Sequence, residues 1–192
     1  GIWFYNVDYS KIENIYIYDV EDNGIYVYSS TNNVMEKNWV DNASGGISLS
    51  GVSSNNVIKE STIVNCSSKG IIIWKGHYNM IVNNHLSNCG DTTEEPAIEL
   101  GCIGSASCGA SYNIVSDNYI SDSNEGILVA EFASGATSYN VVANNTIKDI
   151  NGYYGSIGLI RVDNNTVKGN TVIGSSGTYY PAIYLYGFAD SN

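Results

Sequence analysis

The sequence predicts an all-β fold in which short parallel strands wind into a solenoid of about seven stacked coils. A strand-like motif recurs at a nearly regular interval along all 192 residues, and a second motif rich in asparagine recurs between its copies. Apolar residues show no 3.6-residue period, while β-branched residues are abundant, which excludes a helical array. We therefore treat residues 1–192 as a single repeat domain.

The first motif is a small residue followed by Ile and then by alternating residues, as in "GIYVY". Its copies begin at Gly1, Gly24, Gly46, Gly70, Ala97, Gly126, Ser156 and Ala182. Because side chains alternate between the two sides of a strand, the Ile of each copy points inward. Stacking the coils then predicts an internal column formed by Ile25, Ile47, Ile71, Ile98 and Ile127.

The second motif contains two asparagines five residues apart, as in Asn113 and Asn118 of "NIVSDNYI". The copy "NVIKESTI" has Ser61 at the second position. Asparagine tolerates the left-handed backbone conformation and bonds to nearby backbone, so these segments predict strands joined by tight turns. Four residues further on, we expect a polar column of Asn42, Asn65, Asn88, Asp122 and Asp149. It is either a side-chain ladder that satisfies turn backbone or, at Asp122 and Asp149, a cation site.

Together these "N-x-V/I-x-x-N-x-V/I" and "G-I-x-V/L" motifs resemble those of the right-handed parallel β-helix family, the pectate-lyase-like solenoids. The resemblance extends over essentially the whole chain and implies a right-handed coil. Such domains occur in polysaccharide lyases, hydrolases and epimerases, and also in phage tailspikes, adhesins and surface proteins. The resemblance therefore implies a fold but does not choose a function.

Composition restricts the partners and the compartment. The formal net charge of −11 and the lack of a basic stripe argue against nucleic acid binding, and no apolar run is long enough to span a membrane. Four cysteines and four glycosylation sequons favour an extracellular or cell-surface glycoprotein. The sequon asparagines are Asn42, Asn65, Asn144 and Asn164.

Two disulfides are expected. Cys66 and Cys89 occupy equivalent positions in adjacent coils, about 4.8 Å apart, which is within the range that a disulfide needs. Cys102 and Cys108 flank the loop "CIGSASC". A metal site is the alternative, but no His lies at ligand spacing, so we expect no metal.

We expect no cofactor, although Ca²⁺ is an alternative at one segment. The segment "DVEDNG" at residues 19–24 resembles the start of a calcium loop. Ser30, however, stands where the loop needs a bidentate Glu, and a turn explains the segment equally well.

Candidate catalytic residues lie on the outward side of the first motif. If the protein is an enzyme, we expect its site to contain Glu99, Glu131 and Arg161, the last being the single arginine of the chain. His77 and His85 could assist them. The alternative is a solvated polar face, and the pattern favours a protein that is not an enzyme.

Aromatic residues on the outward side gather at both ends of the predicted stack. They are Trp3, Tyr5, Tyr26, Tyr184 and Tyr186. One interpretation is a surface on which sugar rings stack, and the other is end-to-end contact. We also expect no terminal caps, because the chain starts and stops near the same strand motif.

These features predict a structural surface or filament subunit whose copies associate head to tail, with Tyr184 of one copy meeting Trp3 of the next. The alternative is a module that binds or processes polysaccharide.

Overall fold

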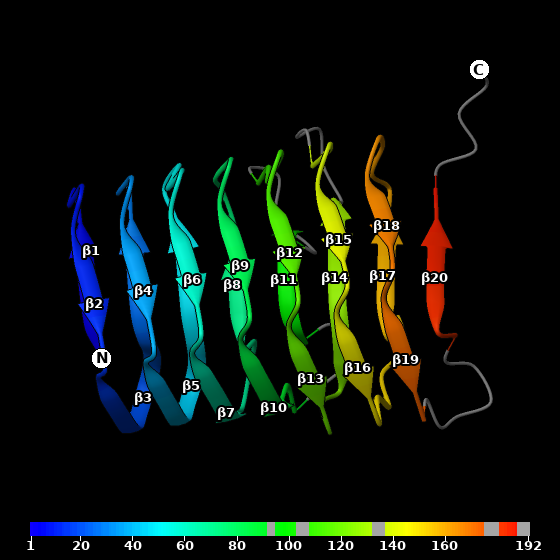
Figure 1. The fold of residues 1–192 in the computed structure, drawn as a ribbon, viewed down its shortest axis with the longest axis horizontal. Helices are drawn as coiled ribbons and strands as arrows, with labels where there is room; N and C mark the ends of the chain where they lie inside the picture. The colour runs from blue at the N-terminus through cyan, green and yellow to red at the C-terminus, as the bar shows by residue number, and fades with distance from the viewer. Residues whose placement is uncertain (92–94, 103–107, 132–136, 175–180, 188–192) are drawn as a thin grey trace.

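The chain is wound into a stack of parallel β-coils. The structure, a computed structural model, describes residues 1–91, 95–102, 108–131, 137–174 and 181–187. Within these ranges it contains 20 strands and no helix, and it therefore offers no helix that could cross a membrane. Each strand pairs in parallel with strands of the neighbouring coils, and Figure 1 shows the coils succeeding one another along the long axis. The predicted all-β solenoid of about seven turns is confirmed.

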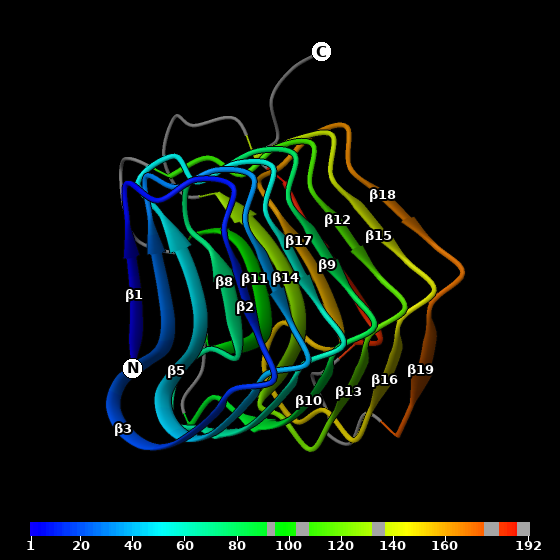
Figure 2. The ribbon, with the colours of Figure 1, turned by 60° about the vertical axis from the view of Figure 1, so that its left-hand side comes forward.

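Each coil has three faces, and strands of the same face stack along the axis (Figure 2). We call face 1 the strands β1 (Ile2–Tyr5), β8 (Ile71–Ile73), β11 (Pro96–Cys102), β14 (Glu125–Glu131), β17 (Ile157–Ile160) and β20 (Ile183–Tyr186), with the second parts of β3 (Tyr16–Tyr28) and β5 (Trp39–Ser50). Face 2 contains β2 (Lys11–Glu13), β4 (Val34–Glu36), β6 (Val57–Lys59), β9 (Met80–Val82), β12 (Ile114–Ser116), β15 (Val141–Ala143) and β18 (Thr166–Lys168).

Face 3 contains the first parts of β3 and β5 followed by β7 (Thr62–Cys66), β10 (His85–Cys89), β13 (Tyr119–Ser121), β16 (Thr146–Lys148) and β19 (Thr171–Ile173). Because β3 and β5 continue around a corner of the coil, faces 3 and 1 join into one 13-stranded sheet. Face 2 is a separate sheet of seven strands.

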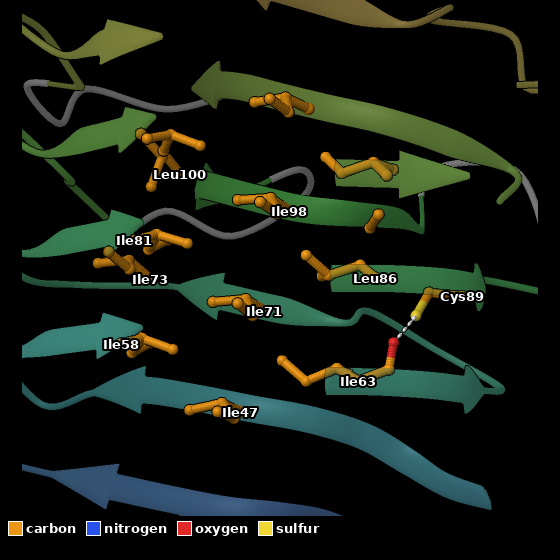
Figure 3. Close-up of a cluster of buried hydrophobic side chains, with 14 of the residues drawn as sticks. Ile47, Ile58, Ile63, Ile71, Ile73, Ile81, Leu86, Cys89, Ile98 and Leu100 are labelled. Carbon is orange, nitrogen blue, oxygen red and sulfur yellow. Dashed lines mark hydrogen bonds between the residues drawn. The ribbon is translucent and has the colours of Figure 1, made fainter. Parts of the chain in front are cut away.

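The core consists of apolar columns that run through the stack. Ile25, Ile47, Ile71, Ile98 and Ile127 are buried and pair directly from coil to coil, which confirms the predicted column. Figure 3 shows members of this column between side chains supplied by the other two faces. Each fully buried Ile of this kind stabilises the fold by roughly 1.5–3 kcal/mol relative to an exposed one.

The two motif asparagines form ladders inside the turns. The first ladder is Asn33, Asn56, Asn79, Asn113, Asn140 and Asn165, and the second is Asn38, Ser61, Asn84, Asn118, Asn145 and Asn170. A typical rung is Asn56, whose Nδ2 donates to Oδ1 of Asn79 (3.2 Å) and to the carbonyl of Ser30 (3.0 Å). The ladders thus satisfy backbone and side-chain groups that the turns bury.

The polar column expected outside the turns is also linked from coil to coil at several positions. Asn42 donates to Asp19 (2.9 Å), Asn65 to Asp41 (2.8 Å) and Asn88 to Asn65 (2.8 Å). Asp122 and Asp149 adopt the same left-handed conformation, with φ of 50° and 53°. Asp149 lies 3.2 Å from the ammonium of Lys148.

One of the two expected disulfides is formed in the structure. Cys102 and Cys108 are bonded, with Cα atoms 5.9 Å apart. Cys66 and Cys89 are instead free, buried thiols. The prediction of a disulfide between them is therefore wrong. They do pair in register, but the parallel spacing holds their Cα atoms about 4.8 Å apart, below the 5.5–6 Å that disulfides prefer. Each thiol donates to a backbone carbonyl instead, and Figure 3 shows the bond from Cys89 to Ile63 (3.8 Å).

Part of the outer surface of face 1 is covered. Leu128, Ala130 and Ile160 point outward from β14 and β17, yet they are buried in a small second cluster. Tyr154 and Tyr184 pack against it. Exposed outward side chains of face 1 include Trp3 and Tyr5 on β1 and Trp74 directly after β8.

Candidate functional site

A pocket with aromatic walls lies on face 1 over the first coils. It has a volume of about 450 Å³, and its lining residues are Trp3, Phe4, Tyr5, Asp22, Asn23, Tyr26 and Tyr28. Strand alternation creates it, since Ile25 and Val27 are buried and the tyrosines between and after them point outward. The rings form two pairs across the coils. Trp3 and Tyr26 have centroids 5.6 Å apart, and Tyr5 and Tyr28 are stacked at 5.1 Å.

A second pocket of about 290 Å³ continues from the first over β5, β8 and β11. Asp22, Asn23 and Tyr26 line both pockets, so we treat the two as one feature, the face-1 groove. The second pocket adds Ser44, Gly45, Ser48, Ser68, Lys69, Ile72, Trp74, Glu99 and Cys102. The groove crosses four coil steps, from β1 to β11, and is therefore about 19 Å long at the usual strand spacing.

The groove has aromatic residues on β1 and β3 and again directly after β8, with polar residues between them. Trp3 is 65% exposed and Trp74 is 44% exposed, so both indole rings are open to solvent. Ser48 lies between them on β5 and pairs with Tyr26 on one side and Ile72 on the other. Apolar walls thus flank a row of groups that can donate and accept hydrogen bonds.

An ion pair lies at the floor of the groove. The Lys69 ammonium lies 3.6 Å from Oε2 of Glu99, whose side chain is only 1% exposed. Burial makes a single charge costly, so each partner offsets the cost of the other. At the rim, Oδ1 of the exposed Asp22 accepts a 2.9 Å bond from Asn23.

The structure places the three candidate catalytic residues in different surroundings. Glu99 lines the groove, whereas Glu131 and Arg161 are not among its lining residues. Glu99 pairs with Leu128, three positions before Glu131, which corresponds to about 10 Å along the strand. Glu131 and Arg161 come closer together, because each directly follows a residue of the pair Ala130 and Ile160.

Glu131 and Arg161 both make contacts with a structural role. Oε2 of the buried Glu131 accepts a 2.8 Å bond from the backbone N–H of Thr137. The Arg161 guanidinium lies over the Tyr186 ring, 5.8 Å from its centroid. A catalytic role for these residues remains a prediction. The expected helpers lie elsewhere: His77 accepts a 3.2 Å bond from Ser111 N–H, and His85 stacks on Tyr119 on face 3.

The other predicted sites have the following positions. The four sequon asparagines are exposed in left-handed turns, with φ between 54° and 57°, and their glycosylation stays a prediction. The part of the chain that the structure describes contains no group of three or more His, Cys, Asp or Glu that could hold a metal ion. The suspected calcium segment forms the bend of β3, and Asp22 and Asn23 from it line the groove.

The residues predicted for head-to-tail contact occupy the expected columns. Tyr184 pairs with Gly158 and Tyr186 with Ile160, which places them in register with Trp3 and Tyr5 through the intervening coils. Tyr184 and Tyr186 stack on each other at 6.3 Å. Contact with another copy remains a prediction.

Sequence reasoning missed Lys69 and the groove as a whole. It placed Glu99 and the aromatic residues outward but did not connect them. The available signal was position, since Lys69 directly precedes Gly70, where the first motif of that coil begins.

Comparison with known proteins agrees with the fold. The family model described as the right-handed beta helix region matches residues 1–130. The chain belongs to the right-handed β-helix family. A solved alginate lyase from Paenibacillus sp. str. FPU-7 has the same fold, with a TM-score of 0.57 and 15% identity, covering 94% of this chain and 72% of that one. This likeness shows a β-helix fold and does not extend to activity. No curated protein matches the sequence.

Proposed function

We propose that the protein is a polysaccharide-binding β-helix module whose ligand lies along the face-1 groove. The observation that carries this proposal is the arrangement of aromatic residues along the groove, with Trp3 and Tyr26 on the first coils and Trp74 after β8, around a polar floor. Aromatic faces suit the flat apolar sides of pyranose rings, and the polar residues between them suit ring hydroxyls.

The direction and shape of the groove support a polymeric ligand. It crosses the strands along the stack for about 19 Å, which is longer than a single sugar ring. Asn23, Ser44 and Ser68 lie along its edge, where they can exchange hydrogen bonds with successive hydroxyls. The similarity in fold to a protein named alginate lyase is consistent with a polysaccharide ligand.

We further propose that the protein works outside the cell. The Cys102–Cys108 disulfide is typical of an oxidising compartment, and the four sequon asparagines are exposed to modifying enzymes. Reduction of that bond would also disturb the groove directly, because Cys102 is one of its lining residues.

Binding is tested by affinity electrophoresis on a broad polysaccharide panel, followed by calorimetry on any ligand found. Trp3→Ala and Tyr26→Ala should each weaken binding about tenfold, because each removes a stacking platform. Trp39→Ala is the matched control, since Trp39 is an exposed tryptophan on face 3, away from the groove. Equal losses in Trp3→Ala and Trp39→Ala, or no binding by the parent, would contradict the proposal.

Head-to-tail association is a second proposal, and the shared columns of Tyr184, Tyr186, Trp3 and Tyr5 support it. Stacking one copy on another would continue both outward aromatic columns. Sedimentation and electron microscopy should show fibres in the parent and loss of fibres in Tyr186→Asp. Fibres of equal length in both proteins would show that the aromatic contact does not contribute to assembly.

A further inference from the structure

We infer that the face-1 groove selects uncharged polysaccharides and rejects polyuronates. This inference rests on the proposed function, since it names the ligand class of the same groove. It is carried by the charges of the lining residues, by their burial and by the place of the remaining cations.

The groove has more negative than positive lining groups. Its charged residues are Asp22, Glu99 and Lys69. The ammonium of Lys69 is already balanced by Glu99 at 3.6 Å, so it offers little net attraction to another carboxylate. Asp22, which is exposed at the rim, then gives the lining residues a net negative charge. A uronate residue entering the groove meets repulsion where it needs a cation.

Burial strengthens this repulsion. The Glu99 side chain is 1% exposed, so water and salt screen its charge much less than they would screen a surface carboxylate. A ligand carboxylate that bound Lys69 would compete with the buried Glu99 for the same ammonium group. Removing one partner of a buried ion pair is strongly destabilising. Binding of a uronate at Lys69 therefore carries a cost that binding of a hydroxyl group does not.

Several of the other cations make contacts away from the groove. Lys11 and Lys59 pair with Glu36 on face 2, and Lys37 lies 3.8 Å from Glu60. Arg161 is the residue type best suited to bind a carboxylate, but its guanidinium lies over Tyr186. The formal net charge of −11 adds a long-range repulsion of any polyanion.

Uncharged sugars meet none of these costs. Stacking on Trp3, Tyr26 and Trp74 is insensitive to ligand charge, and the Asp22 carboxylate can accept strong hydrogen bonds from hydroxyls. The inference thus separates this chain from the alginate lyase with which it shares its fold, since alginate is a polymer of uronates.

The test compares neutral glucans, mannans and galactans with alginate and polygalacturonate, at low and at high ionic strength. At low ionic strength we expect the best neutral polymer to bind at least about tenfold more tightly than either polyuronate. High salt should reduce the difference in affinity between neutral polymers and polyuronates, because it screens the repulsion of the charged ligand. The affinity for neutral polymers should stay nearly unchanged.

Two variants test whether the charged residues of the groove cause the selectivity. Glu99→Gln keeps the shape of the side chain and releases the Lys69 charge, so the affinity for alginate should rise about tenfold relative to the affinity for the best neutral polymer. Glu60→Gln is the matched control, because it removes the same charge beside Lys37 at the turn after β6. Asp22→Asn at the exposed rim should change affinity in the same direction as Glu99→Gln without disturbing a buried group.

The outcomes separate the two proposals. Alginate binding as tight as neutral binding, or tighter, would overturn the inference while leaving the groove as a binding site. A Glu60→Gln effect as large as the Glu99→Gln effect would also overturn it, because selectivity would then come from net charge alone. Failure to bind any polymer of either class would remove the proposed function together with the inference.

Discussion

The Nδ2 group of Asn79 donates a 3.1 Å hydrogen bond to Oδ1 of Asn113, although the two buried residues are 34 positions apart in the sequence. The preceding rungs of the same ladder, Asn33 to Asn56 and Asn56 to Asn79, are each 23 positions apart. The ladder thus keeps its register across the longest coil of the series. The additional residues of the longer coil therefore do not change the turn that contains the ladder or the core beneath it.

Replacing Asn113 by Ala should destabilise the fold by about 3 kcal/mol, because several buried polar groups would lose their partners together. Oδ1 of Asn113 accepts from the backbone and side-chain nitrogens of Asn79, and its Nδ2 donates to Gly76 and Asn140. Urea unfolding of the parent and of Asn113→Ala, monitored by circular dichroism, measures this loss.

Asn113→Ser is the matched control, and the chain itself provides the precedent. Ser61 stands in the second ladder, where its hydroxyl accepts from Asn38 N–H (3.2 Å) and donates to Lys59 (3.0 Å). The serine variant should therefore lose clearly less stability than the alanine variant. If both variants unfold at the same urea concentration, the hydrogen bonds of the ladder do not contribute to stability.

Ile98→Ala should cost about 2–5 kcal/mol, because the side chain is fully buried between Ile71 and Ile127 and its removal leaves a cavity. Ile114→Ala on face 2 should cost much less, since that side chain is 37% exposed. Thermal unfolding of the two variants checks the difference. A similar loss in both would contradict the inward orientation of the Ile column.

The repeat allowed the coil architecture to be predicted from the sequence. The position of each Gly-Ile or Ala-Ile motif fixed the phase of one strand per coil, and strand alternation then fixed which side chains point inward. Ile25 and Ile98 were placed correctly in this way. The asparagine spacing predicted turns, but it did not show that Asn79 and Asn113 would bond to each other within them.

The groove could not be predicted in the same way, because it depends on what covers the outer surface. Glu99 and Leu128 occupy the same outward column and are both buried, yet Glu99 lines the groove beside Lys69 while Leu128 packs in the second apolar cluster. Strand alternation predicts the same outward orientation for both residues. Lys69 also reaches Glu99 from a turn, at a distance that depends on side-chain geometry and not on motif spacing.

Cys66 and Cys89 should be counted as two free thiols per chain when the protein is denatured without reductant and treated with a thiol reagent. In the native protein they should react very slowly. The neighbouring Cys89 thiol and burial raise the pKa of Cys66, so almost no thiolate is present at neutral pH. Cys66→Ser is the control and should show one thiol. Finding no thiol in the denatured parent would show that the two sulfurs are bonded after all.

Glu36 should make stability depend on pH in the acid range. Its hydrogen bonds to Lys11 and Lys59 lower its pKa to about 2, below the usual value of an unfolded glutamate. A lowered folded-state pKa means that the stabilisation is present at neutral pH and is lost as the pH falls from about 4.5 towards 2. The melting temperature of the parent should therefore exceed that of Glu36→Gln at pH 7, and the two should converge near pH 2. Glu60→Gln, which removes a more exposed partner of Lys37, should differ less from the parent at pH 7 than Glu36→Gln does. A gap between the parent and Glu36→Gln that stays constant with pH would mean that the carboxylate is not stabilised by these lysines.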